Sequence, residues 1–222
     1  IFVGVVLFLT RQADSIGRFG RVLIGLGLIM FALQWISVAA KPVVQARGVQ
    51  VIFASLTGDG LLDLLVAALL TILCYSSLAV VLLVATLASL QVIALPVALG
   101  LVLGANLGSG ILGMLSTLKS PPEARRVTLG NFLFKLIGCV LAIPLLGHVD
   151  GWIEGLDLGP AREVVLFHFT FNVALALLFI FWTEKIARIA EHLLPARPLA
   201  DDPAKPRNLD PSVYAELVTY LE

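Results

Sequence analysis

The hydrophobic positions of this chain form long continuous runs rather than an alternating pattern. Barrel strands in a membrane alternate apolar and polar residues, so continuous runs favour helices. A helix needs about 20 residues to cross a bilayer, and the run Ile1–Thr10 is too short, so it is interpreted as the tail of a truncated helix. We predict membrane segments at the longer runs, which are Val22–Ala40, Leu61–Leu90, Pro96–Leu118, Val127–Leu146 and Val164–Thr183.

Composition supports the same class of protein. Hydrophobic residues make up 59% of the 222 residues and charged residues 14%, whereas a soluble domain carries about 25% charged residues. We therefore predict an all-α membrane protein. The 15 basic and 15 acidic residues balance, which argues against nucleic acid as a partner, because binding it requires a basic surface. Cys74 and Cys139 lie inside apolar runs and are interpreted as reduced packing residues.

The basic loops predict the topology. Lysine and arginine gather in Arg11–Arg21, Lys119–Arg126 and Glu184–Arg207, and basic loops favour the cytoplasm. Counting spans between these loops places both ends of Leu61–Leu90 on the outer side. A single helix over that run would be about 45 Å long, against a hydrocarbon core of about 30 Å. We therefore predict a re-entrant hairpin that turns back near Ser76–Ser77. The alternative, one long tilted span, violates the charge rule at one end.

The chain divides into a membrane unit and a tail. Residues 1–194 are predicted to form the transmembrane unit, and residues 195–222 a cytoplasmic linker, because several prolines argue for extended chain there. The chain begins at Ile1 without a methionine and stops at Glu222 in a helix-like stretch. We therefore expect a piece of a longer protein.

Hydroxyl side chains mark the predicted hairpin turn. Ser76 and Ser77 lie near the middle of Leu61–Leu90, and a turn at membrane depth must be buried in protein or face a water-filled cavity. Hydroxyls and free backbone amides at such a tip can bind an ion or an oxyanion. The alternative is that the two serines hydrogen-bond to the preceding turn of a continuous helix.

Small and polar residues mark the run that follows the predicted hairpin. Gly100, Gly104 and Gly108 are spaced for a close helix-packing face. Asn106 and Ser109 are polar residues within the same run, and they suit a discontinuous helix whose unwound backbone binds ions. We predict the discontinuous helix, and the packing face is the alternative.

Two later spans each carry a polar pair one helical turn apart. Asn131 precedes Lys135, and His168 precedes Asn172. A lysine inside a span is unfavourable unless it faces a cavity or a partner, or extends its amino group to the cytoplasmic interface; both interpretations stay open. For His168, near the outer interface, the alternative to a functional role is helix packing.

Several of these residues fall in motifs that resemble those of the sodium–phosphate cotransporter family. Gly-Ala-Asn-Leu-Gly-Ser at 104–109 resembles the family's Gly-Ala-Asn-Ile-Gly-Thr, and Tyr-Ser-Ser-Leu-Ala at 75–79 lies where the family carries Gln-Ser-Ser-Ser-Ala. Further elements resemble the family in the same order, namely Glu-Ala-Arg-Arg at 123–126, Leu-Phe-Lys-Leu-Ile-Gly at 133–138 and Phe-His through Phe-Asn at 167–172.

The resemblance implies a fold and an activity. The family is built from two inverted repeats, and this chain resembles the second, so that a missing first repeat of the same protein would be its partner. Bacterial members often continue into a PhoU-like cytoplasmic helical domain, and residues 208–211 resemble the lead into it. The implied function is a secondary transporter in the bacterial inner membrane, which takes up inorganic phosphate by alternating access with sodium as the coupling ion.

Four departures from the family motifs bear on the coupling ion. Tyr75 stands in place of glutamine, Leu78 in place of serine, and Ser109–Gly110 in place of a threonine-rich stretch, which together remove side-chain oxygens that sodium needs. Lys135 stands in place of asparagine and adds an ammonium group. We hypothesise that Lys135 substitutes in part for a bound cation, or attracts the anion directly.

The predicted site holds phosphate and sodium without covalent chemistry, so no enzyme activity and no cofactor beyond the coupling ion are expected. Sodium is assigned to Ser76, Ser77, Asn106 and Ser109, and the further candidate ligands of substrate or ion are Tyr75, Gly104, Gly108, Asn131, Lys135 and Asn172. The alternatives are a non-transporting membrane sensor or scaffold with a degenerate ion site, and a transporter of another anion. The sequence leaves a homo-oligomer open.

Overall fold

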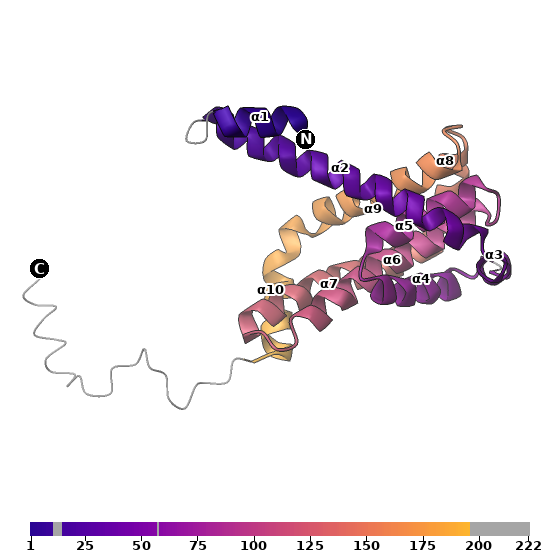
Figure 1. The fold of residues 1–222 in the computed structure, drawn as a ribbon. Coiled ribbons are helices and arrows are strands. Elements are labelled where there is room, and N and C mark those ends of the chain that lie inside the picture. The colour runs from indigo at the N-terminus through magenta and orange to yellow at the C-terminus, as the bar shows by residue number, and fades with distance from the viewer. Residues whose placement is uncertain (11–14, 57, 196–222) are drawn as a thin grey trace, which may run out of the picture.

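A computed structural model describes residues 1–10, 15–56 and 58–195. These residues form helices and no strand, as the hydrophobic runs predict (Figure 1). Their α-helices are α1 (Phe2–Thr10), α2 (Ser15–Gln45), α3 (Arg47–Ala54), α4 (Gly60–Cys74), α5 (Ser77–Ser89), α6 (Leu95–Ser116), α7 (Pro122–Ala142), α8 (Leu146–Glu154), α9 (Pro160–Phe179) and α10 (Thr183–Leu193). Two short 3-10 helices, Ile143–Leu145 and Ile180–Trp182, join α7 to α8 and α9 to α10.

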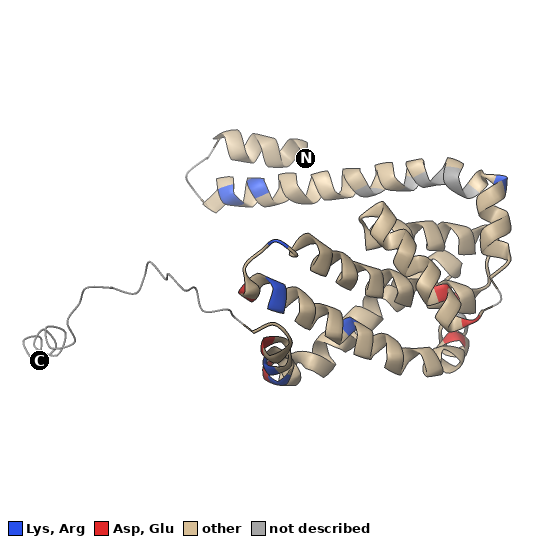
Figure 2. Cartoon of the chain, turned by 90° about the horizontal axis from the view of Figure 1, so that it is seen from below, with Lys and Arg blue, Asp and Glu red and all other residues tan. Residues whose placement is uncertain are grey.

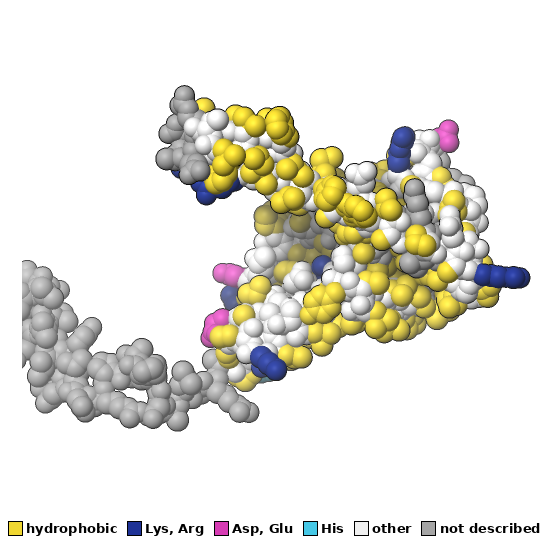
Figure 3. All heavy atoms as spheres, in the orientation of Figure 1, with side chains coloured by type: hydrophobic (Ala, Val, Ile, Leu, Met, Phe, Trp, Pro, Cys, Tyr) yellow, Lys and Arg dark blue, Asp and Glu magenta, His cyan; other side chains and the backbone are white. Residues whose placement is uncertain are grey.

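The helical stretches have the length and the surface of a multi-pass membrane protein. Among the described residues, the stretches long and apolar enough to cross a membrane are Ser15–Ile36, Leu95–Ser116, Pro122–Ile153 and Pro160–Leu193. Hydrophobic side chains cover much of the face in Figure 3, and most charged side chains gather toward its two ends. In Figure 2 the starts of α2 and α7, which carry basic residues, lie at one end, and the start of α4 lies at the other.

Helix α6 lies at the centre of the body and is buried along most of its length. It packs against α4, α5, α7, α8 and α9. A helix that is apolar all round belongs in such a position, because every side has a neighbour. Three of its leucines, Leu99, Leu101 and Leu103, have no exposed surface.

Helices α4 and α5 form a hairpin that begins and ends at the same end of α6. Tyr75 ends α4 with a left-handed φ of 57°, a conformation that only a minority of non-glycine residues adopt. Ser76 then caps α5, its hydroxyl accepting the Ala79 N–H at 3.2 Å. Gly58, before α4, lies beside Val97 at the start of α6. The turn between α4 and α5 therefore lies where the sequence predicts it. Entry of this hairpin into a membrane stays a prediction.

Glycines bring the backbones of α4 and α6 into contact. A Cβ atom at Gly108 would lie 2.6 Å from the Ala68 carbonyl oxygen, and one at Gly104 would collide with the Leu64 carbonyl oxygen. The order of these contacts shows that the two helices run parallel. The small-residue packing face predicted from the glycine spacing is confirmed.

The predicted discontinuous helix is wrong, because α6 continues without a break from Leu95 to Ser116. Its polar side chains bond to the helix on which they lie. Asn106 donates to the Val102 carbonyl at 3.1 Å, and the Ser109 hydroxyl donates to the Asn106 carbonyl at 2.7 Å. Such back-bonding satisfies polar groups without unwinding, so Asn106 and Ser109 do not require a gap in the helix.

Other segment boundaries differ from those predicted. Helix α2 continues five residues beyond Ala40, the end of the predicted span, and is followed by α3. Helix α8 follows the predicted span Val127–Leu146. Between α7 and α8 the chain tightens at Pro144 into a 3-10 turn. Apart from residue 195, the predicted linker 195–222 lies outside the described residues.

Substituting Gly104→Ala is expected to lower the stability of the protein by about 1–3 kcal/mol, the range for overpacking a close-packed interface. The added methyl group meets the backbone of α4 at Leu64, which has no rotamer to change. Gly113→Ala on the same helix is the matched control, since its nearest neighbour, Thr128, would lie at an ordinary 3.8 Å. Thermal unfolding in detergent compares the two, and an unchanged midpoint for Gly104→Ala contradicts the proposed contact.

Candidate functional site

A hydrogen-bonded cluster joins α6 to α9 at Asn106. This side chain is only 2% exposed, and its amide nitrogen lies 3.2 Å from His168 Nδ1. Asn172 donates to the Asn106 Oδ1 atom at 3.0 Å and also to the His168 carbonyl at 2.8 Å. Because His168 and Asn172 lie one turn apart on α9, both reach the same residue of α6. The cluster satisfies the polar atoms of Asn106 inside an apolar body.

Lys135 connects α7 to this cluster through a serine. Its amino group donates a hydrogen bond to the Ser109 hydroxyl, which itself donates to the Asn106 carbonyl. No carboxylate of the described residues lies within ion-pair distance of Lys135. An ammonium group has three donors, and the serine takes one of them. The amino group is therefore held in place without an acidic partner among the residues that the structure describes.

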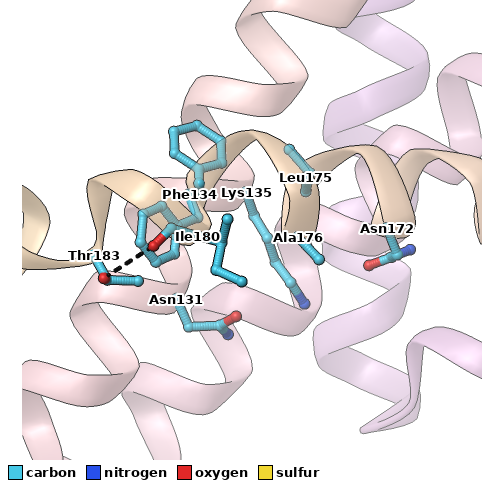
Figure 4. Close-up of a pocket in the computed structure, with 9 residues that line it drawn as sticks. Asn131, Phe134, Lys135, Asn172, Leu175, Ala176, Ile180 and Thr183 are labelled. Carbon is cyan, nitrogen blue, oxygen red and sulfur yellow. Dashed lines mark hydrogen bonds between the residues drawn. The ribbon is translucent and has the colours of Figure 1, made fainter.

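A cavity of about 410 Å³ opens beside Lys135 between α7 and the end of α9. In Figure 4 the Lys135 amino group ends between the amides of Asn131 and Asn172. Thr183 adds a hydroxyl, and the remaining lining residues are Phe134, Leu175, Ala176, Phe179 and Ile180. An apolar concavity with a few converging polar groups is typical of sites for small ligands.

Four of the predicted ligands come together here. Asn106, Ser109, Lys135 and Asn172 are connected by hydrogen bonds, and Asn131 lines the cavity from an exposed position. His168, for which the sequence left packing open, belongs to the same cluster.

The hairpin residues have local partners. Ser76 caps α5, Tyr75 is 67% exposed, and no hydrogen bond among the described residues joins either to Asn106. Ser77 is the first residue of α5. The candidate ligands Gly104 and Gly108 face α4. The predicted sodium site, which combines Ser76 and Ser77 with Asn106 and Ser109, stays a prediction.

Sequence reasoning missed two residues. Thr183 borders the cavity. It is the last residue of the predicted span Val164–Thr183, and its position at the end of a span gave no reason to expect a binding role. Asp63 is completely buried although it lies near the start of a run interpreted as uniformly apolar. A charged residue inside a membrane segment is by itself a signal for function, and this signal could have identified Asp63.

Comparison with known proteins decides the family. Residues 41–183, which include every element of the cluster and the cavity, match the model of the Na+/Pi-cotransporter family. The chain belongs to the Na+/Pi-cotransporter family. The resemblance of its motifs is thereby confirmed.

Two curated relatives of this Na+/Pi-cotransporter chain are named as phosphate export proteins. The "Putative inorganic phosphate export protein YjbB" of Salmonella typhimurium is 47% identical over 212 residues, and the protein of that name from Escherichia coli K12 is 46% identical. Each match covers 96% of this chain but 39% of the relative. The uncharacterized protein YqeW of Bacillus subtilis is 26% identical over 89% of the chain and 64% of its own length. No solved structure matches the chain.

Removing the Asn172 amide from this Na+/Pi-cotransporter chain tests the cluster. Asn172→Ala leaves the buried Asn106 Oδ1 atom without its donor, which we expect to lower stability by roughly 1–2 kcal/mol. Asn131→Ala is the control, because Asn131 is exposed and lines the same cavity. Thermal unfolding in detergent gives both values. Equal midpoints for the two variants contradict the role given to Asn172.

Proposed function

We propose that the protein carries inorganic phosphate across a membrane and that the cavity beside Lys135 receives the anion. The observation that supports this proposal most is the unneutralised ammonium group of Lys135 at an apolar cavity. A charge inside a membrane protein is unfavourable unless it faces a cavity or a partner. Lysine is a common point-charge ligand of phosphate, and phosphate offers several oxygens to the donors that Lys135 does not use on Ser109.

The surrounding amides fit the same ligand. Asn131 and Asn172 lie on either side of the lysine and each carries N–H donors. A phosphate bound there would exchange its hydration shell for donors from α7 and α9. The names of the YjbB relatives and of the family support phosphate as the substrate.

The hairpin and the topology belong to the same proposal. The arms α4 and α5, of 15 and 13 residues, are about 22 and 20 Å long, and each is shorter than a hydrocarbon core of about 30 Å. The hairpin therefore enters the bilayer from the outer side and returns there, and the tail lies in the cytoplasm. Alternating access moves the phosphate, with the first repeat completing the pathway. Sodium, held near Ser76, Ser77, Asn106 and Ser109, is the coupling ion.

Phosphate flux in liposomes tests this function. The full-length protein is reconstituted, and radiolabelled phosphate is followed in both directions. We expect Lys135→Ala to lower the flux at least tenfold, and Lys135→Arg, which keeps a positive charge, to retain part of it. The control is Lys185→Ala on α10. The Lys185 amino group lies over the exposed Trp182 ring, 4.2 Å from the centre of that ring.

The outcomes are distinct. Absence of flux in the unaltered protein contradicts phosphate transport, and flux that prefers sulfate shows another anion as the substrate. Flux that Lys135→Ala leaves unchanged removes the cavity from the pathway, whatever the substrate.

Lys135→Asn tests whether the lysine does part of the work of a cation, since asparagine is the residue of the family motif. We expect this variant to depend more steeply on sodium than the unaltered protein, because the ammonium charge is lost. Initial rates are measured while sodium is replaced by choline. Sodium dependence that is identical in the two proteins contradicts this role of Lys135.

A further inference from the structure

Asp63 is the one completely buried carboxylate of α4, and both of its oxygens lack a hydrogen-bond partner among the described residues. It lies one turn into the helix, against α6. A Cβ atom at Gly100 would be 2.9 Å from the Asp63 Cβ atom and 3.1 Å from its Oδ2 atom. The carboxyl group therefore occupies the space that a side chain at Gly100 would fill.

A negative charge is strongly disfavoured at this position. Burial of an ionised carboxylate requires a counter-ion or several hydrogen bonds, and the surroundings offer neither. The nearest residues on its own helix that share the packing face, Leu64 and Ala67, are apolar. The neutral acid is the form that fits, because it removes the charge without a partner.

The charged groups around Asp63 reinforce this conclusion. Helices α5 and α6, which pack against α4, carry no titratable side chain. Asp59 is exposed at the start of α4, and its carboxylate caps the helix by accepting the N–H groups of Leu61 and Leu62. Its negative charge disfavours a second negative charge on Asp63. Helix α8, whose Leu146 lies 3.5 Å from the position of a Gly60 Cβ, carries the titratable residues His148, Asp150 and Glu154.

The ligand chemistry at Asp63 suits a proton and not a metal ion. Hard cations such as calcium and magnesium take about six oxygen ligands, and no group of three acidic, histidine or cysteine residues was found among the described residues. Thr71, the other polar residue of this face, lies two turns away. A proton needs a single oxygen.

The contact between α4 and α6 holds a second unsatisfied polar group. Thr71 is also completely buried, and its hydroxyl has no partner among the described residues. It packs against Gly108, just as Asp63 packs against Gly100. Two unpaired polar side chains thus face one dry stretch of α6. Separation of α4 from α6 would admit water to both and would allow Asp63 to ionise.

We propose that Asp63 is a proton-binding site, loaded while α4 packs against α6 and emptied when the two helices separate. On release, the O–H bond of the carboxyl group breaks, the proton passes to water, and a carboxylate remains. The buried acid is one turn from the exposed Asp59, a rise of about 6 Å. Linkage of this step to phosphate movement rests on the proposed function; proton binding itself does not.

Infrared spectroscopy of the full-length protein in lipid tests proton binding directly. We expect a protonated-carboxyl band at mildly acidic pH that disappears in Asp63→Asn and persists in Asp59→Asn, where asparagine still caps α4. Asp63→Ala, which fits beside Gly100 without a polar group, replaces Asp63→Asn if that variant does not fold. A spectrum that neither substitution of Asp63 changes overturns the proposal.

Flux under a pH gradient tests the linkage. Titration of phosphate itself contributes equally to all variants, so any difference between them reports the protein. We expect Asp63→Asn to keep phosphate exchange at equal pH but to lose most of the stimulation by a pH gradient, whereas Asp59→Asn keeps it. Equal stimulation in Asp63→Asn and the unaltered protein overturns the linkage. Absence of all phosphate flux contradicts the proposed function instead, and the infrared result then still decides whether Asp63 binds a proton.

Discussion

The backbone contact between α4 and α6 is the constraint on which the rest of the structure depends. Gly104 and Gly108 leave no room for a side chain between the two helices. Helix α4 is therefore held parallel to α6, and the chain must turn at Tyr75 for α5 to return to the start of α6. The side of α6 that carries Asn106 and Ser109 is left to α7 and α9. One central helix thus has a dry packing face and a polar face.

Two ionisable side chains lie within the apolar body at different depths along α6. Asp63 packs against Gly100, whereas Lys135 bonds to Ser109, and a separation of nine positions along the helix corresponds to about 14 Å. Asp63 has no exposed surface and no hydrogen-bond partner within the described part of the chain, while Lys135 borders a cavity with amides on both sides. This difference in surroundings is the reason for assigning a proton to one and an oxyanion to the other.

The sequence predicts those features that depend on contiguous residues. Run length and loop charge place a turn close to Tyr75, where α4 ends. The continuity of α6 was not predictable in this way. Whether Asn106 unwinds its helix depends on His168 and Asn172, which lie 62 and 66 residues further along the chain. Local pattern alone therefore suggested a break where tertiary hydrogen bonds make one unnecessary.

The most direct test of the account is a structure of the full-length protein in a lipid nanodisc, determined by electron cryomicroscopy with phosphate present. The account predicts an anion in the cavity between α7 and α9, within hydrogen-bond distance of the Lys135 amino group and close to the amides of Asn131 and Asn172. An anion bound elsewhere, with the Lys135 cavity filled by lipid, would contradict it.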